Sequence, residues 1–297
     1  MLRYDSTGLT GLPTLEDDGL LTPSTGQWAR KKYRLVQYYS RLFVDSMRHK
    51  WDHLVYVDLF AGAGRARIRP AGAIVPASPL LAVDIPNRFT RYVFCEINKA
   101  RIEVLEERVR RDFPSVDARC VCGDANEEAS SILAEMPVPS RKCTVLSFCF
   151  VDPYRLASLR FETIRALSAR YVDFLVLIPA YMDAQRNLQN YLKPGSDRVE
   201  AFLGLSDWRD RWKKASDSGT KFGAFVVEQF GSQMEKLGYH YGGLGDTELV
   251  RGTSKNIPLY RLVFFSRHSL GAKFAKQARK GTRRQLRMFE EFGIDLE

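Results

Sequence analysis

Apolar segments typical of buried strands alternate with amphipathic segments typical of helices between residues 54 and 178. The strand patterns cover 54–60, 91–97, 118–122, 144–152 and 172–178. When a helix joins two strands of one sheet, the chain returns in the same direction and the strands run parallel. Strands that are apolar throughout must be covered on both faces. The alternation therefore predicts an α/β fold, with a doubly wound, mostly parallel sheet between two layers of helices.

Segments outside this alternation set the remaining boundaries. Residues 1–25 are rich in Gly, Thr, Pro and Asp and predict a flexible N-terminal arm. We expect the main domain in two parts, over 26–180 and 217–297, because short amphipathic helix patterns over 181–216 indicate a helical insertion. The Gly-, Pro- and Arg-rich residues 65–77 predict a loop.

Composition predicts a soluble protein of a reducing cytoplasm. The five cysteines lie in apolar, strand-like stretches and form no C-x-x-C pair, so we expect reduced packing residues. The first residues lack the apolar core of a signal peptide. The longest apolar run, over 172–179, is too short to cross a bilayer.

Basic residues gather in two segments that also carry aromatic rings. From Leu249 to Phe289 the chain holds eleven Lys or Arg residues and no acid, within a net charge of +10. The segment 30–34 (R-K-K-Y-R) forms the second group, and a basic helix is expected to close the chain. Such segments suit phosphate contacts and base stacking, although a solvated helix face has the same composition. The predicted nucleic-acid contacts are Lys31, Lys32, Arg155, Arg267, Lys273, Lys276, Arg279, Lys280, Arg283, Arg284 and Arg287.

Acidic residues and glycines stand at the ends of four predicted strands. They are Asp58 with the run 61–64 (A-G-A-G), Glu96, Gly123-Asp124 and Asp152. The carboxyl ends of the strands in a doubly wound sheet open onto one crevice, where ligands bind. There glycines let the backbone approach a ligand, Glu96 can accept hydrogen bonds from ribose hydroxyls, and Asp124 can accept one from an adenine amino group. Asp58 can hold the turn or meet a cationic end of the ligand.

This ordered series resembles the motifs of class I S-adenosylmethionine-dependent methyltransferases. The pattern D-x-F-x-G-x-G over 58–64 is more typical of that class than of dinucleotide dehydrogenases, whose fingerprint is G-x-G-x-x-G. Arg67 stands where the last glycine of that fingerprint would be. The resemblance implies S-adenosylmethionine as the cofactor. The residues that it places at the cofactor are Asp58, Phe60, Ala61, Gly62, Gly64, Glu96, Ile97, Asp124 and Ala125.

The strand 144–152 ends in Asp152-Pro153-Tyr154. Amino methyltransferases of nucleic acids carry Asp/Asn-Pro-Pro-aromatic at this strand end, where the acid accepts hydrogen bonds from the target amine and the ring stacks on the flipped base. By this resemblance Asp152 and Pro153 would orient the acceptor and Tyr154 would stack on it, while Arg155 suits a phosphate. The loop here has one proline in place of two and is a residue shorter.

Six motifs together resemble the three-Cys-motif partner proteins. They are W-A-R-K-K-Y (28–33), V-Y-V-D-L-F-A-G-A-G (55–64), A-S-P-L-L-A (77–82), G-D-A-N (123–126), F-V-D-P-Y (150–154) and L-V-F-F-S-R-H-S-L-G (262–271). The resemblance covers roughly residues 28–280. It implies the class I methyltransferase-like Rossmann fold and an iron–sulfur-type partner protein that itself bears the three cysteines.

Three hypotheses for the function follow. The leading hypothesis is methylation of DNA or RNA by S-adenosylmethionine, at an amino nitrogen. The alternative is a non-catalytic subunit of the same fold that binds nucleic acid, and a third reading is a pocket for another adenosine-containing ligand. The alternative role for the acids at the strand ends is that each caps the helix that follows it. The four histidines lack the spacing of metal ligands, and the chain has no nucleophile elbow or Walker motif, so we predict no metal site.

Overall fold

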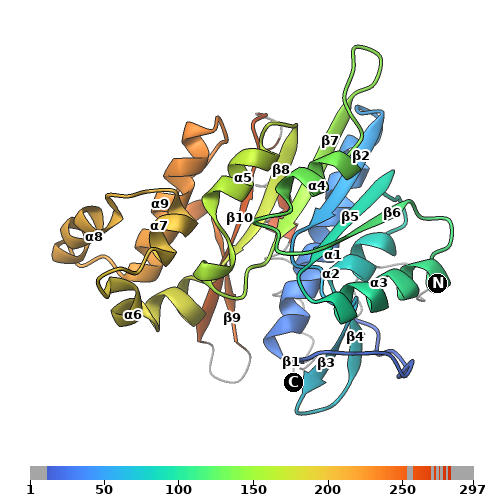
Figure 1. Cartoon of the computed structure of the whole chain (residues 1–297), viewed down its shortest axis with the longest axis horizontal. Helices are drawn as coiled ribbons and strands as arrows, with labels where there is room; N and C mark the ends of the chain where they lie inside the picture. Colours follow the sequence, from blue (N-terminus) through green and yellow to red (C-terminus); the bar gives the residue numbers. More distant parts are fainter. Residues whose placement is uncertain are drawn as a thin grey trace.

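The computed structural model describes residues 12–252, 257–268, 271, 274, 277, 278, 280 and 281. Its centre is a seven-stranded sheet with the order β6-β5-β2-β7-β8-β10-β9 (Figure 1). The strands are β2 (His53–Asp58), β5 (Arg91–Glu96), β6 (Ala118–Cys122), β7 (Val145–Val151), β8 (Val172–Ile178), β9 (Glu248–Arg251) and β10 (Pro258–Phe265).

Strand direction confirms the predicted doubly wound, mostly parallel sheet. The first five of these strands along the chain pair in parallel, whereas β10 is antiparallel to both β8 and β9. The last strand thus enters between the fifth and sixth strands in the opposite direction. This order and this single reversal define the class I methyltransferase-like fold.

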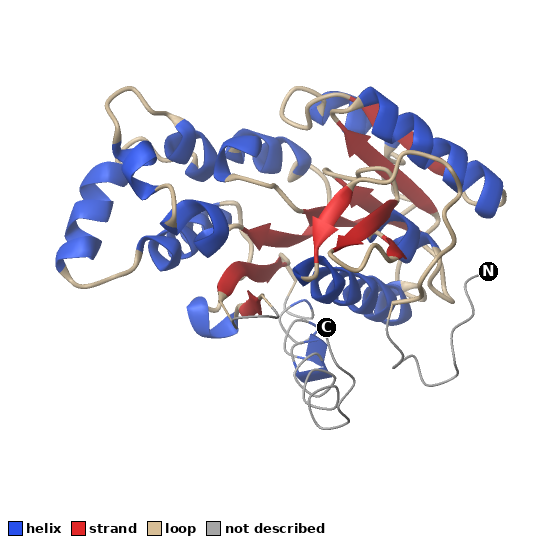
Figure 2. Ribbon diagram, turned by 90° about the horizontal axis from the view of Figure 1, so that it is seen from below, coloured by secondary structure: helices blue, strands red, loops and turns tan. Residues whose placement is uncertain are grey.

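Helices cover both faces of the sheet, as Figure 2 shows. One face packs on α1 (Trp28–Met47), α2 (Ser78–Val83) and α3 (Lys99–Asp112). The other packs on α4 (Ala129–Glu135), α5 (Phe161–Leu167), α7 (Arg198–Leu203), α8 (Trp208–Asp217) and α9 (Phe222–Lys236). Side chains of one strand alternate between the two layers: Tyr56 faces α1, whereas Val57 faces the opposite core.

The loop predicted over 65–77 is wrong. This segment forms a hairpin of β3 (Arg65–Arg69) and β4 (Ile74–Pro76), and β1 (Ser24–Gly26) adds a third strand to it. Ala66 and Ile68 are buried between outward arginines, so the stretch R-A-R-I-R has the period-2 pattern of a strand. Pro70 and Gly72, which suggested a loop, lie at the turn of the hairpin, whereas Pro76 ends β4.

The described part of the predicted flexible arm is packed against the domain, which corrects that expectation. Leu12 is buried, Leu15 bridges to Ile74, and Asp18 forms an ion pair with Arg108 of α3. This N-terminal segment therefore packs against the domain although it is rich in polar, turn-forming residues. Residues 1–11 lie outside the described residues.

A helical lobe follows β8 (Figure 1). It consists of the π-helix η2 (Ala180–Gln185), α6 (Leu188–Leu192), α7 and α8, and it occupies the stretch for which we predicted an insertion. Strands β9 and β10 pair as an antiparallel hairpin. Most of the predicted C-terminal basic helix lies outside the described residues, but Phe274 is described and packs against the rings of Tyr39 and Phe43. Every helix in the described part of the chain is too short or too polar to cross a membrane.

Candidate functional site

A cavity of about 610 Å³ opens at the carboxyl ends of the parallel strands. Its volume lies within the range of small-molecule sites, and its position is where a doubly wound sheet binds ligands. Eight of the residues predicted to contact the cofactor or the acceptor line it, from all four strand ends: Phe60, Gly62, Glu96, Ile97, Asp124, Ala125, Asp152 and Tyr154. Four others lie behind the wall or beside the opening and are not among the lining residues: Asp58, Ala61, Gly64 and Pro153.

Glu96 ends β5 and fixes the turn beside it. Its Oε2 accepts a hydrogen bond from the Gly62 backbone N–H at 2.9 Å, and its Oε1 accepts one from the Asn98 N–H at 2.9 Å. The side chain is 6% exposed and lines the cavity. Each carboxylate oxygen has a second lone pair, so Glu96 can still accept a hydrogen bond from a ligand hydroxyl.

Asp124 follows β6, the strand that pairs with β5, and also lines the cavity. Its Oδ1 accepts hydrogen bonds from the backbone N–H and the side-chain amide of Asn126, at 2.9 and 2.8 Å. Among the described residues, no donor contacts Oδ2. Asn126 in turn accepts from the Arg160 N–H and the Thr163 hydroxyl, both at 2.8 Å, and so joins this loop to the start of α5. A cap alone would not require this arrangement.

The glycine-rich turn connects β2 to β3. Gly62 and Gly64 have φ values of 66° and 79°, a region that favours glycine. The fully buried Arg108 donates to the Ala63 carbonyl at 2.6 Å and supports the turn from below. The backbone of the turn can therefore come close to a ligand in the cavity.

Asp58 is fully buried under this turn. Its carboxylate accepts hydrogen bonds from the Phe60 N–H at 3.1 Å and the Tyr56 hydroxyl at 3.3 Å, and it bonds with Ser78 at the start of α2. Burial, with a smaller contribution from nearby Asp152, raises the pKa of Asp58 to about 7 against the opposing effect of its hydrogen bonds. Of the two roles expected for Asp58, the geometry favours holding the turn.

Asp152, the acid of the Asp-Pro-Tyr loop, pairs with Lys32 of α1. The Lys32 Nζ lies 2.5 Å from Asp152 Oδ2, and the two side chains are only 9% and 15% exposed. The ammonium also lies 5.0 Å from the ring centroids of Trp28 and Tyr33. Burial alone would lower the pKa of Lys32, but the Asp152 carboxylate, with smaller contributions from Tyr33 and Asp58, raises it overall, which keeps the lysine charged.

The loop after Asp152 is held by the helical lobe. Asp183 of η2 is buried, and its Oδ2 accepts from the Leu156 N–H at 2.7 Å and from the Tyr191 hydroxyl at 2.5 Å. Tyr154 itself is 64% exposed, and the Arg155 guanidinium lies 5.5 Å from its ring centroid. The exposed ring is available to a second molecule at the cavity opening.

The predicted nucleic-acid contacts separate into different environments. Lys32 is a buried ion-pair partner and not a surface phosphate contact, which corrects that prediction. The Arg267 guanidinium donates to the Ser168 carbonyl at 2.6 Å and to the Leu237 carbonyl at 3.2 Å, so it serves the fold. Arg155 and Lys280 are exposed, and Lys31 lies on α1. Lys273, Lys276, Arg279, Arg283, Arg284 and Arg287 lie outside the described residues.

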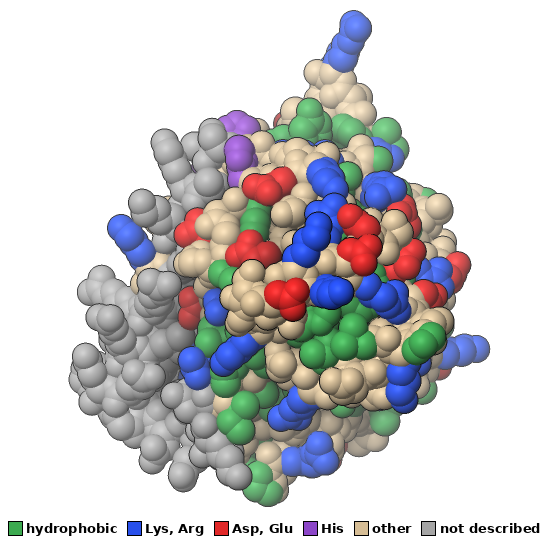
Figure 3. Space-filling view, turned by 90° about the vertical axis from the view of Figure 1, so that its left-hand side faces the viewer, with side chains coloured by type: hydrophobic (Ala, Val, Ile, Leu, Met, Phe, Trp, Pro, Cys, Tyr) green, Lys and Arg blue, Asp and Glu red, His purple; other side chains and the backbone are tan. Residues whose placement is uncertain are grey.

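Charge on the helical lobe is mixed. On the face that carries α6 to α8, Lys and Arg side chains are interspersed with Asp and Glu side chains (Figure 3). The described residues of this face form no continuous basic patch. The lobe is therefore a poor track for a phosphate backbone.

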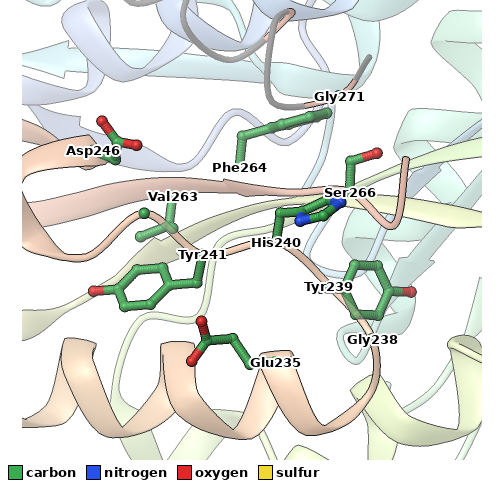
Figure 4. Close-up of a pocket in the computed structure, with 11 residues that line it drawn as sticks. Glu235, Gly238, Tyr239, His240, Tyr241, Asp246, Val263, Phe264, Ser266 and Gly271 are labelled. Atoms are coloured by element: carbon green, nitrogen blue, oxygen red, sulfur yellow. The ribbon is translucent and has the colours of Figure 1, made fainter. Parts of the chain in front are cut away.

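A second cavity, of about 370 Å³, lies between the end of α9 and strand β10 (Figure 4). Its walls include Glu235, His240, Tyr241 and Asp246, and it contains none of the residues predicted for a cofactor. The strand-end cavity is thus the candidate active site.

Sequence reasoning missed the roles of four residues of this site: Lys32 as a partner of Asp152, Trp28 and Tyr260 in the wall, and Asp183 behind the loop. The spacing of Trp28 and Lys32, four residues apart on one helix, was the available signal. Nothing in the local sequence pointed to Asp183.

Comparison with known proteins finds likeness in structure alone. No known family model and no curated protein matches the sequence. The resemblance to three-Cys-motif partner proteins therefore stays a prediction. Many solved chains share the arrangement of elements.

Three of these structures illustrate the range of TM-score, sequence identity and coverage. A Legionella pneumophila protein of family model DUF519 has a TM-score of 0.44 and 11% identity, over 84% of this chain and 90% of that one. An rRNA methylase from Streptococcus thermophilus has a TM-score of 0.38 and 9% identity, over 78% and 92%. The N-terminal domain of EvdMO1 with SAH bound has a TM-score of 0.32 and 9% identity, over 48% of each chain. Each TM-score is below 0.5, so the fold assignment rests on the strand order.

Proposed function

We propose that this protein is an S-adenosylmethionine-dependent methyltransferase that modifies an amino nitrogen of a nucleic acid. The observation that carries the proposal is the cavity that joins two groups of residues. Glu96 and Asp124 face it from the strand ends where a nucleoside cofactor would lie, and Asp152 and Tyr154 face it from the end where an acceptor would enter.

The cavity fits S-adenosylmethionine in its donor set. Glu96 would accept from the ribose hydroxyls, Asp124 Oδ2 would accept from the adenine amino group, and the backbone at Gly62 would approach the amino-acid part. The cofactor would supply a methyl group on a positive sulfonium, and its transfer to an amine leaves a neutral thioether and releases one proton. Three acids, Glu96, Asp124 and Asp152, line the cavity beside the two cations Lys32 and Arg101, and this excess of acids suits a cationic group.

The chain's own residues would act mainly by positioning. Asp152 would accept a hydrogen bond from the amine and orient the lone pair of the nitrogen, and its carboxylate can take the proton that is released. Tyr154 would stack on the base, a contact worth roughly 1–3 kcal/mol. Arg155 would contact a neighbouring phosphate. An iron–sulfur-type partner with three cysteines belongs to the proposal through the motif resemblance.

One observation favours a second function, a non-catalytic subunit that binds nucleic acid. Lys32 already occupies one oxygen of Asp152, the acid that a target amine would need. In this alternative the fold and the exposed Tyr154 would serve binding alone.

Calorimetric titration of S-adenosylmethionine tests the first step. We expect binding by the wild type and loss of at least tenfold in affinity in Glu96→Ala and Asp124→Ala. A folded wild type that binds no cofactor contradicts the methyltransferase proposal. Cofactor binding without transfer of a labelled methyl group to any DNA or RNA favours the non-catalytic subunit.

A further inference from the structure

The Lys32–Asp152 ion pair forms part of the wall of the candidate active site. Both residues line the cavity, and their side chains come from elements 120 positions apart in the sequence. The rings of Trp28 and Tyr33 hold the ammonium at 5.0 Å on two sides. A lysine fixed in this way differs from a surface lysine because its head group has one defined position.

The pair offers a hydrogen-bond donor beside an acceptor. An ammonium has three N–H groups, and the contact with Asp152 Oδ2 uses one of them. Among the described residues, no donor contacts Asp152 Oδ1. A ligand that meets the pair therefore finds a carboxylate oxygen that accepts and, next to it, a charged N–H that donates.

A group that matches this pair must carry a donor next to an acceptor. A simple alkyl amine, such as a protein lysine, has no acceptor atom beside its nitrogen. On the edge away from the sugar, guanine places a ring N–H donor beside its amine. Adenine and cytosine both place an unprotonated ring nitrogen there, and they share this aminopyridine-like edge.

Aromatic side chains around the pair suit a flat ring. Trp28 and Tyr260 line the cavity with their ring centroids 5.3 Å apart, and Tyr154 lines it from the loop. The three rings and the ion pair together complement one face and one edge of a heterocycle.

We propose that Lys32 reads the ring nitrogen next to the target amine, while Asp152 accepts from the amine itself. The acceptor is then the 6-amino edge of adenine or the 4-amino edge of cytosine, and Lys32 is a specificity-determining residue. This inference rests on the proposed methyltransferase function. It also makes the Lys32–Asp152 ion pair compatible with catalysis, because the pair would bind the acceptor base and would not block Asp152.

Single-stranded oligonucleotides with one target base, made as DNA and as RNA, test the inference. One pair carries adenine or 1-deazaadenine, in which C–H replaces the ring nitrogen, and a second pair carries cytosine or 3-deazacytosine. A 7-deazaadenine oligonucleotide is the control, because it keeps the nitrogen that Lys32 would read. Anisotropy measures binding in the presence of S-adenosylhomocysteine, and a labelled methyl group measures transfer.

For the base that is the target, we expect the deaza form to bind and react about tenfold more weakly or worse, because it loses a hydrogen bond from a charged donor. The 7-deaza form should match adenine. Lys32→Met should abolish the difference between the parent and deaza forms, whereas Lys50→Met, on the exposed segment before β2, should keep it. If Lys32→Met fails to fold, Lys32→Arg takes its place. This variant retains the positive charge and should keep part of the difference between the parent and deaza forms.

Each outcome separates this inference from the proposed function. Equal treatment of parent and deaza bases by the wild type overturns the inference while methyl transfer still stands. Discrimination that persists in folded Lys32→Met also overturns it, because another group must then read the nitrogen. If the wild type binds the cofactor and methylates none of the oligonucleotides, the proposed function fails first.

Discussion

Arg108 and Asp18 form a two-pronged ion pair between α3 and the N-terminal segment. The guanidinium Nε lies 3.0 Å from Asp18 Oδ2, and Nη2 lies 2.7 Å from Oδ1. Arg108 is fully buried and also donates to the Ala63 carbonyl in the glycine-rich turn. One side chain thus joins the start of the chain, a helix and the turn at the candidate cofactor site.

Loss of this pair should be costly, because Asp18→Asn leaves the fully buried Arg108 guanidinium without a carboxylate, and Arg108→Met leaves Asp18 with only its ion pairs to Arg65 and Arg111. Arg108→Met or Asp18→Asn should lower the free energy of unfolding by about 3–5 kcal/mol, measured by urea denaturation. Arg110→Gln, an exposed change on the same helix, should shift it by less than about 0.5 kcal/mol. Equal effects of Arg108→Met and Arg110→Gln would contradict this role.

The same pair sets a pH dependence. Its hydrogen bonds with Arg108 hold the pKa of Asp18 well below the usual range. A carboxyl with a depressed folded-state pKa contributes stability that is present above about pH 4 and is lost as the pH falls further. The difference in unfolding free energy between wild type and Asp18→Asn should therefore shrink below pH 4, and a constant difference would argue against the pair.

Asp58 should act in the opposite direction. Burial raises its pKa to about 7 in the folded protein, so between about pH 4 and pH 7 the folded chain holds a proton that the unfolded chain has released. The contribution of Asp58 to stability must then fall as the pH rises through this window, by a few kcal/mol on the order of the shift. Urea denaturation across the window should show this fall in the wild type and not in Asp58→Asn; parallel curves would refute it.

The sheet was predictable because its signals are local. The run 145–151 is apolar except for Ser147 and is buried at every position, and the rules for parallel strands bring the carboxyl ends of such runs together without knowledge of any contact. Glu96, Asp124 and Asp152 could therefore be assigned to one crevice from the printed sequence.

The partners of those residues were not predictable. Lys32 meets Asp152 only because the beginning of α1 lies beside the carboxyl end of β7, and Arg108 meets Asp18 across 90 residues. Both lysine and arginine look like surface charges in sequence, since burial is decided by packing of distant elements. The hairpin over 65–76 was missed for another reason, because turn residues outweighed a strand pattern of only five positions.

The two glycines of the turn should differ in their tolerance of a side chain. Both have positive φ, so alanine costs about 1–2 kcal/mol at either position. A Cβ at Gly62 meets nothing within 4 Å, whereas one at Gly64 would lie 2.8 Å from Leu105 Cδ1. We expect Gly64→Ala to cost about 1–3 kcal/mol more than Gly62→Ala because of overpacking. Thermal unfolding of both variants measures this difference in cost, and equal costs would mean that Leu105 moves aside freely.

We predict that Asp183 of the helical lobe supports methyl transfer to the acceptor and not binding of the cofactor. Asp183→Asn would replace the charged acceptor of Leu156 and Tyr191 by a neutral amide oxygen, and its amide nitrogen would oppose the Asn187 amide that now donates to Oδ1, so the anchor of the loop behind Tyr154 is weakened. We expect the affinity for S-adenosylmethionine to stay within about twofold, while transfer to the acceptor falls by about tenfold or more, as for one buried hydrogen bond to a charged group. Tyr191→Phe removes one of these bonds and should give a smaller loss in the same direction. Calorimetry and labelled-methyl transfer, measured on the same samples, separate the two steps. A parallel loss of cofactor affinity would show that Asp183 supports the whole cavity and not the acceptor loop.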